Sequence, residues 1–254
     1  MARIVLKVGS AVLTQDNTIS LSRMQALVDF IKELRNKNEV ILVSSGAVSA
    51  GYTELQLDKK ILKHKQALAA IGQPILMHKY FEKFSKENIL CSQVLVTANN
   101  LSRKDDSKRI QDTIDVLLDN NVIPIVNEND ATATQELEIG DNDQLSAYIT
   151  KETSADILVI LSDIDAYYDK DPRKYNDASI LKCVKSIDPK ALEKDCTPHN
   201  EIATGGIVTK LKAAKYLLDN NISMFLASGF DLSDIKSFLI DNKHMGGTLF
   251  KGES

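Results

Sequence analysis

The sequence is poor in the features that mark secreted, membrane and metal-binding proteins. Its three cysteines are scattered and never form a C-x-x-C pair, which disfavours a disulfide or a zinc site. The four histidines show no metal-ligand spacing either. No apolar run is long enough to cross a membrane, and the first residues contain no signal-peptide core. We therefore expect a cytoplasmic protein with reduced thiols.

Neither sign of charge dominates, because 31 Lys and Arg residues oppose 35 Asp and Glu residues and give a formal net charge of -4. This balance argues against broad binding to nucleic acids or anionic membranes. Hydrophobic residues make up 43% of the chain and charged residues 26%, which is typical of a folded globular protein. The 254 residues contain no repeat, no low-complexity tract and no flexible linker. We expect one domain over residues 1–254 with no nucleic-acid or membrane partner.

Three common active-site motifs are also missing. The chain has no G-x-x-x-x-G-K-[ST] sequence, so it is not a P-loop enzyme, and no G-x-G-x-x-G fingerprint for a dinucleotide. Ser45 stands in Ser-Ser-Gly and does not form the G-x-S-x-G elbow of a hydrolase. Any phosphate chemistry must therefore use another arrangement.

What the chain does have is an alternation of short apolar runs and helical patterns. Strands are predicted at residues 4–8, 40–43, 89–96, 122–126, 156–161 and 222–226, with helical periodicity between them. This alternation predicts an α/β protein with a mostly parallel sheet and helices on both faces. Ser22 begins a capping-box pattern for the first long helix, and Pro74 is expected to start a separate helix. Residues 164–208 lack periodicity and are expected to be rich in loops.

Polar clusters follow the predicted strand at residues 122–126. An Asn-Glu-Asn-Asp motif occupies residues 127–130, and a Gly-Asp-Asn-Asp motif at residues 140–143 ends where a helical pattern begins. Ligands in open α/β sheets bind beyond the carboxyl ends of the strands. One Asn-Asp pair would be explained by ordinary loop and cap chemistry, but two clusters around one loop favour a site for an amino acid or a metal.

Four further loops have small or polar residues where a strand ends, and in three of them a glycine beside Ser or Thr suits phosphate binding. They lie at residues 7–10, 44–47, 162–163 and 204–210. Lys7 ends a buried strand and Lys210 opens a helix, where a cation opposes the helix dipole. Either lysine alone is equally well explained by a side chain that reaches solvent. Together they favour a shared anionic partner.

These residues supply the parts of a phosphoryl-transfer site that has no P-loop. Such a site needs cations over the transferring group, a carboxylate that holds Mg²⁺ or orients those cations, and an acceptor pocket in line. Lys7 and Lys210 would be the cations and Asp143 the carboxylate. Residues 127–130 would form the acceptor pocket.

The motifs at residues 7–10, 45–47, 127–130, 140–143, 169–173 and 204–211 occur in an order that resembles the amino acid kinase family over essentially the whole chain. The resemblance is strongest to the branch that phosphorylates the γ-carboxylate of L-glutamate. It implies a three-layer αβα sandwich, ATP with Mg²⁺, and glutamyl 5-phosphate as product, the first intermediate toward proline. It also implies a homo-oligomer (dimer or tetramer) and proline as a feedback inhibitor.

The resemblance carries roles to individual residues. Lys7 and Lys210 would stabilise the transferring phosphoryl group, and Asp143 would position both lysines. The residues expected to hold the amino acid are Ser45, Gly46, Ala47, Asn127, Asp130 and Asn142. Those expected to hold ATP are Lys7, Gly9, Ser10, Ser162, Asp163, Thr204, Gly205, Gly206, Ile207, Val208, Thr209 and Lys210. Residues 1–150 would form mainly the amino-acid lobe and residues 151–254 mainly the ATP lobe, and no residue is assigned as a direct metal ligand.

The chain departs from the family pattern in two glycine loops. Gly9-Ser10-Ala11 stands where the family often has Gly-Thr-Ser, and Ala203 stands where it has the first glycine of Gly-Thr-Gly-Gly. Both changes keep small residues, so activity is expected to survive. We expect no C-terminal PUA domain of the kind that many relatives carry. Two alternatives stay open: a kinase for another small carboxylate such as N-acetylglutamate, and a nucleotide or amino-acid sensor without catalysis.

Overall fold

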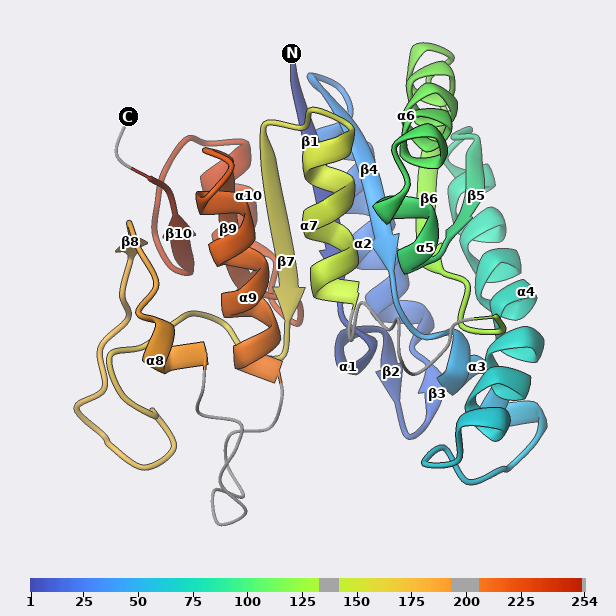
Figure 1. Ribbon diagram of the computed structural model, residues 1–254, viewed down its shortest axis with the longest axis horizontal. Helices are drawn as coiled ribbons and strands as arrows, with labels where there is room; N and C mark the ends of the chain where they lie inside the picture. The colour runs from blue at the N-terminus through green and yellow to red at the C-terminus, as the bar shows by residue number, and fades with distance from the viewer. Residues whose placement is uncertain (133–141, 193–205, 253–254) are drawn as a thin grey trace.

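The computed structural model describes residues 1–132, 142–192 and 206–252. Its centre is an eight-stranded sheet with the order β5-β6-β4-β1-β7-β9-β10-β8 (Figure 1). The strands of this sheet are β1 (Ala2–Val8), β4 (Asn38–Ser44), β5 (Cys91–Val96), β6 (Ile123–Glu128), β7 (Ile157–Ser162), β8 (Cys183–Val184), β9 (Ser223–Ser228) and β10 (Thr248–Phe250). A separate small hairpin pairs β2 (Thr14–Gln15) with β3 (Thr18–Ile19).

Helices cover both faces of the sheet. They are α1 (Ser10–Leu13), α2 (Leu21–Leu34), α3 (Ala47–Glu54), α4 (Leu62–Lys86), α5 (Ala98–Ser102), α6 (Lys104–Asp119), α7 (Asn142–Glu152), α8 (Pro189–Leu192), α9 (Gly206–Leu218) and α10 (Ser233–Leu239). Buried residues of α2, α4 and α10 pack against one face, and those of α6, α7 and α9 pack against the other (Figure 1). The predicted αβα sandwich is therefore confirmed.

The strands pair in parallel except where β10 runs antiparallel to β9, which confirms the mostly parallel sheet. Side chains along a strand alternate between the two faces. In β1, Leu6 packs with the α2 and α4 side, whereas Val5 packs with the α7 and α9 side. Lys7 has the same parity as Val5, so the alternation places it on the face covered by α7 and α9.

The carboxyl ends of the parallel strands meet along one edge of the sheet, which is the lower edge in Figure 1. Val8 of β1 pairs with Ser44 of β4 on one side and with Leu161 of β7 on the other. Helices α7 and α9 begin at this same edge (Figure 1). The edge therefore collects residues that lie far apart in the sequence.

The expectation that Pro74 starts a separate helix is wrong, because α4 runs without interruption from Leu62 to Lys86 and contains Pro74. A proline inside a helix removes one backbone hydrogen bond and costs about 3 kcal/mol or more. Burial of one long helix face offsets this cost, since Leu68, Leu76 and Phe84 are all fully buried. Tertiary packing thus overrides a local helix-breaking signal.

The capping box predicted at Ser22 is also wrong. Helix α2 begins at Leu21, its N-cap residue is Ser20, and the Ser20 side chain makes no capping bond. The Ser22 hydroxyl lies 3.2 Å from the Ser20 hydroxyl. A capping box is present instead at α5, where Thr97 and Asn100 bond each other's backbone N–H groups.

Two further observations concern expectations from composition. Cys91 is buried and Cys183 exposed, and both are free thiols, whereas Cys196 lies outside the described residues. Across the three described segments, no helix is both long enough and apolar enough to cross a membrane.

Helices α3 and α4 touch through two glycines. A Cβ atom added at Gly51 would lie 1.9 Å from the Leu68 carbonyl oxygen. One added at Gly72 would lie 1.8 Å from the Ala47 carbonyl oxygen, and both contacts are far shorter than side chains tolerate. Since these neighbours are backbone atoms, only glycine permits the two helices to approach this closely.

We expect Gly72→Ala to lower the free energy of unfolding by about 1–3 kcal/mol or more, because the new methyl group must push α3 away from α4. Gly252→Ala is the matched control, because nothing lies within 4 Å of its added Cβ atom. Urea unfolding of the two variants beside the parent measures the effect. Equal stability of both variants would show that the α3–α4 contact adapts without cost.

Candidate active site

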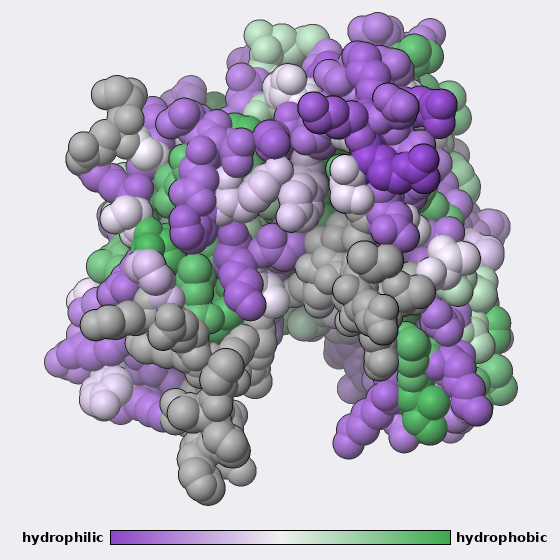
Figure 2. Space-filling view, in the orientation of Figure 1, coloured by the Kyte–Doolittle hydropathy of each residue, from purple (hydrophilic) through white to green (hydrophobic). Residues whose placement is uncertain are grey.

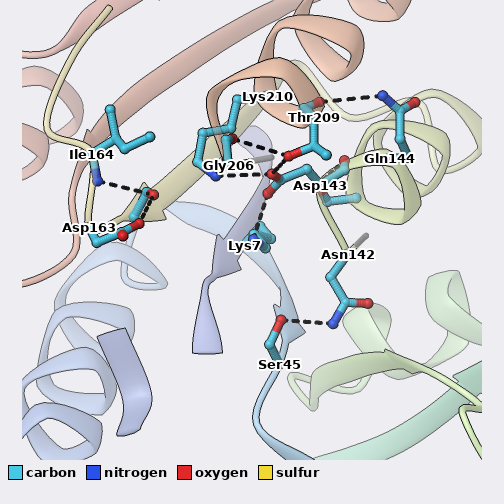
Figure 3. Close-up of polar contacts among 12 residues, drawn as sticks. Lys7, Ser45, Asn142, Asp143, Gln144, Asp163, Ile164, Gly206, Thr209 and Lys210 are labelled. Atoms are coloured by element: carbon cyan, nitrogen blue, oxygen red, sulfur yellow. Dashed lines mark hydrogen bonds and ion pairs between the residues drawn. The ribbon is translucent and has the colours of Figure 1, made fainter. Parts of the chain in front are cut away.

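Three buried charged side chains meet at the carboxyl edge of the sheet. The Lys7 ammonium lies 2.5 Å from Asp143 Oδ1, and the Lys210 ammonium lies 3.1 Å from Asp143 Oδ2 (Figure 3). Asp143 is fully buried, and the two lysine side chains are 4% and 5% exposed. We refer to Lys7, Asp143 and Lys210 as the charged triad.

Three separate elements deliver the triad. Lys7 comes from the central strand β1, Asp143 from the first turn of α7, and Lys210 from the start of α9. Thr209 of α9 also connects the helices α7 and α9, because its hydroxyl donates to Asp143 Oδ2 at 2.8 Å. The Lys210 ammonium also donates to the Gly206 carbonyl oxygen at 2.9 Å (Figure 3). The triad is therefore fixed by its surroundings and not by one flexible loop.

Electrostatics keep the central carboxyl ionised. Burial alone raises the pKa of Asp143, but the charges of Lys7 and Lys210 outweigh it and lower that pKa to about 2. The triad then contains two cations and one anion, so one positive charge remains uncompensated within it. An uncompensated buried charge is costly. The site therefore favours an anion beside the two lysines.

A cavity of about 330 Å³ opens beside the triad. It is lined by Ser10, Ser45, Gly46, Ala47, Val48, Ser49, Lys59, Lys65, Asn127, Glu128, Asp130 and Asn142. All six residues expected to hold an amino acid are in this set. Ser10, which was expected near the nucleotide, also lines this cavity. The structure thus brings together two polar clusters and two loops that are distant in the sequence.

The wall formed by residues 45–47 depends on a glycine. Gly46 has φ +111°, a left-handed conformation that residues with a side chain rarely adopt, and it is the N-cap residue of α3. The turn directs the start of α3 toward the cavity, where unpaired backbone N–H groups favour negative charge. The Asn142 side-chain nitrogen donates to the Ser45 hydroxyl at 2.8 Å (Figure 3).

A lysine that the sequence did not reveal faces this cavity. The Lys65 ammonium, on α4, lies 3.8 Å from Asp130 Oδ1, and Lys59 also contributes to the lining. Lys65 stands in a polar segment with several other lysines, so composition alone could not single it out. Its nearness to Asp130 arises from the packing of α4 beside β6.

Asp163 and Gly206, two of the residues expected to hold the nucleotide, lie at the same edge, directly after β7 and at the start of α9 (Figure 3). Ser162 is the last residue of β7. Its hydroxyl donates to Asp163 Oδ1 at 2.8 Å and accepts from the Ile164 N–H (Figure 3). Gly9 donates its N–H to the Leu161 carbonyl oxygen at 3.0 Å. Val208 is buried in the core, while Thr204 and Gly205 lie outside the described residues. Gly206 and Ile207 open α9.

Among residues 1–132, 142–192 and 206–252, no group of three or more His, Cys, Asp or Glu side chains could hold a metal ion. Asp143 is already bonded to both lysines and to Thr209.

Gln73 is a further residue that the sequence interpretation did not assign. It is only 9% exposed, and its Oε1 atom accepts a hydrogen bond from Asn127 Nδ2 at 2.8 Å. The sequence did contain one signal for Gln73. This residue lies three positions before Leu76 and seven before Tyr80, which puts a polar residue on the buried face of the helix.

The chain resembles known proteins over nearly its whole length. The model of the Amino acid kinase family matches residues 2–228. A glutamate 5-kinase of Wolinella succinogenes is 50% identical over 255 residues and covers 98% of both chains. A glutamate 5-kinase of Leishmania donovani is 49% identical, over 98% of this chain and 94% of its own.

Solved structures resemble the fold at low sequence identity. An isopentenyl phosphate kinase of T. acidophilum has a TM-score of 0.67 at 16% identity, over 98% of this chain and 99% of its own. A carbamate kinase of Giardia lamblia bound to AMP-PNP also has a TM-score of 0.67 at 16% identity, over 99% of both chains. At this level of identity they support the fold alone. From the family match and the close sequence relatives, we conclude that the chain belongs to the amino acid kinase family.

Proposed function

We propose that the protein transfers the γ-phosphoryl group of ATP to the γ-carboxylate of L-glutamate and forms glutamyl 5-phosphate. The observation that carries the proposal is the charged triad beside a polar cavity of about 330 Å³. Relatives at 50% and 49% identity that bear the name glutamate 5-kinase support the choice of substrate. The reaction would supply the first intermediate of proline biosynthesis.

The chemistry of this reaction matches a site without a general base. A γ-carboxylate oxygen attacks the γ-phosphorus, a new P–O bond forms, and the bond from that phosphorus to the β–γ bridging oxygen breaks. The carboxylate is already ionised at neutral pH, so no proton has to be removed before the attack. What the enzyme must supply is alignment and neutralisation of charge on the transferring group.

The charged triad fits this requirement. Lys7 and Lys210 would contact the phosphoryl oxygens, whose charge shifts toward the leaving ADP as the bond breaks. Asp143 would not react, because it is fully buried and bonded to both ammonium groups and to Thr209. Its role would be to hold the two ammonium groups in fixed positions, one beside each carboxylate oxygen.

The cavity fits an amino acid with two carboxylates. Asp130 and the carbonyl oxygen of Asn142 offer acceptors for an ammonium group, and Ser45 offers a hydroxyl. Lys59 and Lys65 add positive charge on the cavity wall, which suits a substrate that carries one more carboxylate than ammonium groups. With its ammonium group at Asp130 and Asn142, L-glutamate would direct its γ-carboxylate toward the charged triad.

The nucleotide would bind on the β7 and α9 side. The N-terminus of α9, with Gly206, Thr209 and Lys210, is suited to phosphate because a helix N-terminus offers N–H groups and a positive dipole. The 204–205 part of this motif lies outside the described residues. This arrangement supports an amino-acid lobe in residues 1–150 and an ATP lobe in residues 151–254.

Magnesium would accompany the nucleotide. Mg²⁺ commonly binds through one or two carboxylates, substrate phosphates and water. Asp143 is occupied by the lysines, which agrees with a metal held chiefly by phosphate oxygens. When bound, the ion would neutralise charge on the phosphates. A cytoplasmic location stays a prediction from the cysteine pattern, and a dimer or tetramer and feedback inhibition by proline stay predictions from the family resemblance.

The proposed reaction is tested by a coupled assay of ADP release with L-glutamate, L-aspartate and N-acetyl-L-glutamate. We expect ADP release that depends on L-glutamate and on Mg²⁺. Release with N-acetyl-L-glutamate but not L-glutamate would assign a different acceptor. Nucleotide binding without release for any acceptor would identify a sensor.

Removal of either triad lysine tests catalysis against binding. Lys7→Ala and Lys210→Ala should each lower kcat by about a hundredfold or more, as for the loss of one preorganised electrostatic donor. The KM for L-glutamate should change little, because the contacts grow in the transition state. A near-parental kcat with a raised KM for ATP would make that lysine a binding residue, and circular dichroism separates either result from unfolding.

The acceptor side is tested by Asp130→Ala, with Lys65→Ala beside it. Asp130→Ala should raise the KM for L-glutamate by about ten- to a hundredfold, because it removes a charge-assisted hydrogen bond worth about 1.5–3 kcal/mol. The KM for ATP should stay close to the parental value. Lys65→Ala removes the neighbouring cation and should leave the preference for L-glutamate over L-aspartate unchanged. A raised KM for ATP alone would move Asp130 out of the acceptor pocket.

A further inference from the structure

Helix α4 buries two polar side chains on the face that it turns toward the sheet. Gln73 and Tyr80 are seven positions apart, or about two helical turns, and both are at most 9% exposed. The Tyr80 hydroxyl lies 2.9 Å from the Ser44 hydroxyl, at the end of β4. Gln73 accepts from Asn127 near the end of β6. Each buried polar group thus reaches the carboxyl end of a strand that borders the cavity.

Gln73 is part of a chain of side-chain amides. Its Nε2 atom donates to Gln93 Oε1 at 3.1 Å, and its Oε1 atom accepts from Asn127 Nδ2 at 2.8 Å. Asn127 Oδ1 in turn accepts from Asn142 Nδ2 at 3.1 Å. The chain therefore runs from the edge strand β5, through α4 and β6, to the first residue of α7.

Backbone groups fix the direction of this chain. The Glu128 N–H donates to Asn127 Oδ1 at 2.9 Å, and a backbone N–H can only donate. Asn142 Nδ2 donates to the Ser44 carbonyl oxygen at 3.2 Å, and a backbone carbonyl can only accept. The oxygen and nitrogen positions of both asparagine amides follow from these two anchors. With Asn127 Nδ2 turned to α4, the Gln73 atom that meets it must be the oxygen.

The consequence appears at the cavity. Asn142 Nδ2 faces Ser44, Ser45 and Asn127, so Asn142 Oδ1 is turned away from them (Figure 3). This oxygen is buried, and no donor for it exists among the residues that the structure describes. The Ser45 hydroxyl accepts from Asn142, which leaves its own hydrogen free to be donated. Asn142 and Ser45 both line the cavity, so an acceptor at Asn142 that has no partner among the described residues and a free donor at Ser45 lie beside it.

We propose that Gln73 is a positioning residue for the amino-acid pocket: it holds the Asn127 amide, which turns the Asn142 carbonyl oxygen toward the substrate ammonium. The inference rests on the proposed function, because the ammonium belongs to the proposed acceptor. Gln73 itself does not touch the substrate in this account. It acts through two neighbours.

The proposal depends on what Asn127 does without Gln73. Asn127 is 1% exposed, and its Nδ2 atom has Gln73 as its partner. A buried amide nitrogen without a partner is costly, so the Asn127 amide would shift toward another acceptor. That shift would strain the contacts of Asn127 Oδ1 with the Glu128 N–H and with Asn142 Nδ2. Asn142 would then be held less firmly, because it would keep only the Ser44 carbonyl oxygen and the Ser45 hydroxyl as acceptors.

The test variant is Gln73→Met, which keeps volume and helix preference but removes both hydrogen bonds. Gln93→Met is the matched control, because it removes only the bond to Gln73 Nε2 and leaves Gln73 Oε1 in place. For each protein, the KM values for L-glutamate and ATP are measured. The inhibition constant of glutarate is measured as well, since glutarate keeps both carboxylates and lacks the ammonium group.

We expect Gln73→Met to raise the KM for L-glutamate by about tenfold or more, the effect of one lost hydrogen bond to a charged group. The KM for ATP and the inhibition constant of glutarate should stay within about threefold of the parental values, because neither involves the ammonium. Gln93→Met should behave as the parent. If Gln73 had only a structural role, the KM for L-glutamate and the inhibition constant of glutarate would rise equally. That result would overturn the proposal.

Gln73→Glu provides a second variant if the methionine variant does not fold. Its carboxylate still accepts from Asn127 Nδ2, so the KM for L-glutamate should stay within about threefold of the parental value. A tenfold rise in that KM would overturn the role of the Gln73 oxygen. A parent that does not use L-glutamate would overturn the proposed function as well. An active parent with unchanged Gln73 variants would overturn only the positioning role.

Discussion

Two lysines are buried against one aspartate where strand β1 and the helices α7 and α9 meet. Lys7, Asp143 and Lys210 come from a strand and two helices that are distant in the sequence. Each would be costly to bury alone, and their mutual contacts at 2.5 and 3.1 Å offset that cost. The excess positive charge that remains is the feature that suits a phosphoryl group. Stability and the proposed chemistry therefore share one constraint.

The fold serves this constraint by bringing strand ends to one edge. The parallel register aligns Val8, Ser44 and Leu161, and the helices that follow the sheet begin where the strands end. Helix α4 packs against the elements that form the cavity. Gly72 lets α3 approach, and Gln73 meets Asn127. One surface of one helix thus combines close backbone packing with a hydrogen bond to a cavity residue.

Much of this arrangement could be predicted from the sequence. Apolar runs located the longer strands, and polar residues directly after them located the edge at which the site lies. Lys7 and Lys210 stood out because each is locally unfavourable where it occurs. The family motifs then supplied roles for the residues at that edge.

The remainder depends on contacts that a local pattern does not contain. Pro74 signalled a helix start, yet packing along α4 carries the helix through it. Strands β8 and β10 have only two and three residues, too few for a period-two pattern. The partners of Lys65 and Gln73 became recognisable only when α4 lay beside Asp130 and Asn127. Such residues act through neighbours that are more than 50 positions away.

Asp143 is expected to stay ionised between two ammonium groups. A carboxyl ¹³C NMR titration, assigned through couplings to the Asp143 backbone, tests this most directly. Burial raises the pKa of Asp143, but the two lysines lower it by more than burial raises it. The resulting pKa is about 2, below the ordinary value of 3.8. The charge therefore stabilises the fold above pH 3.8 and loses that effect as the pH falls toward 2. We predict a constant carboxyl shift from pH 7 down to about pH 4. A titration at or above 3.8 would contradict the account.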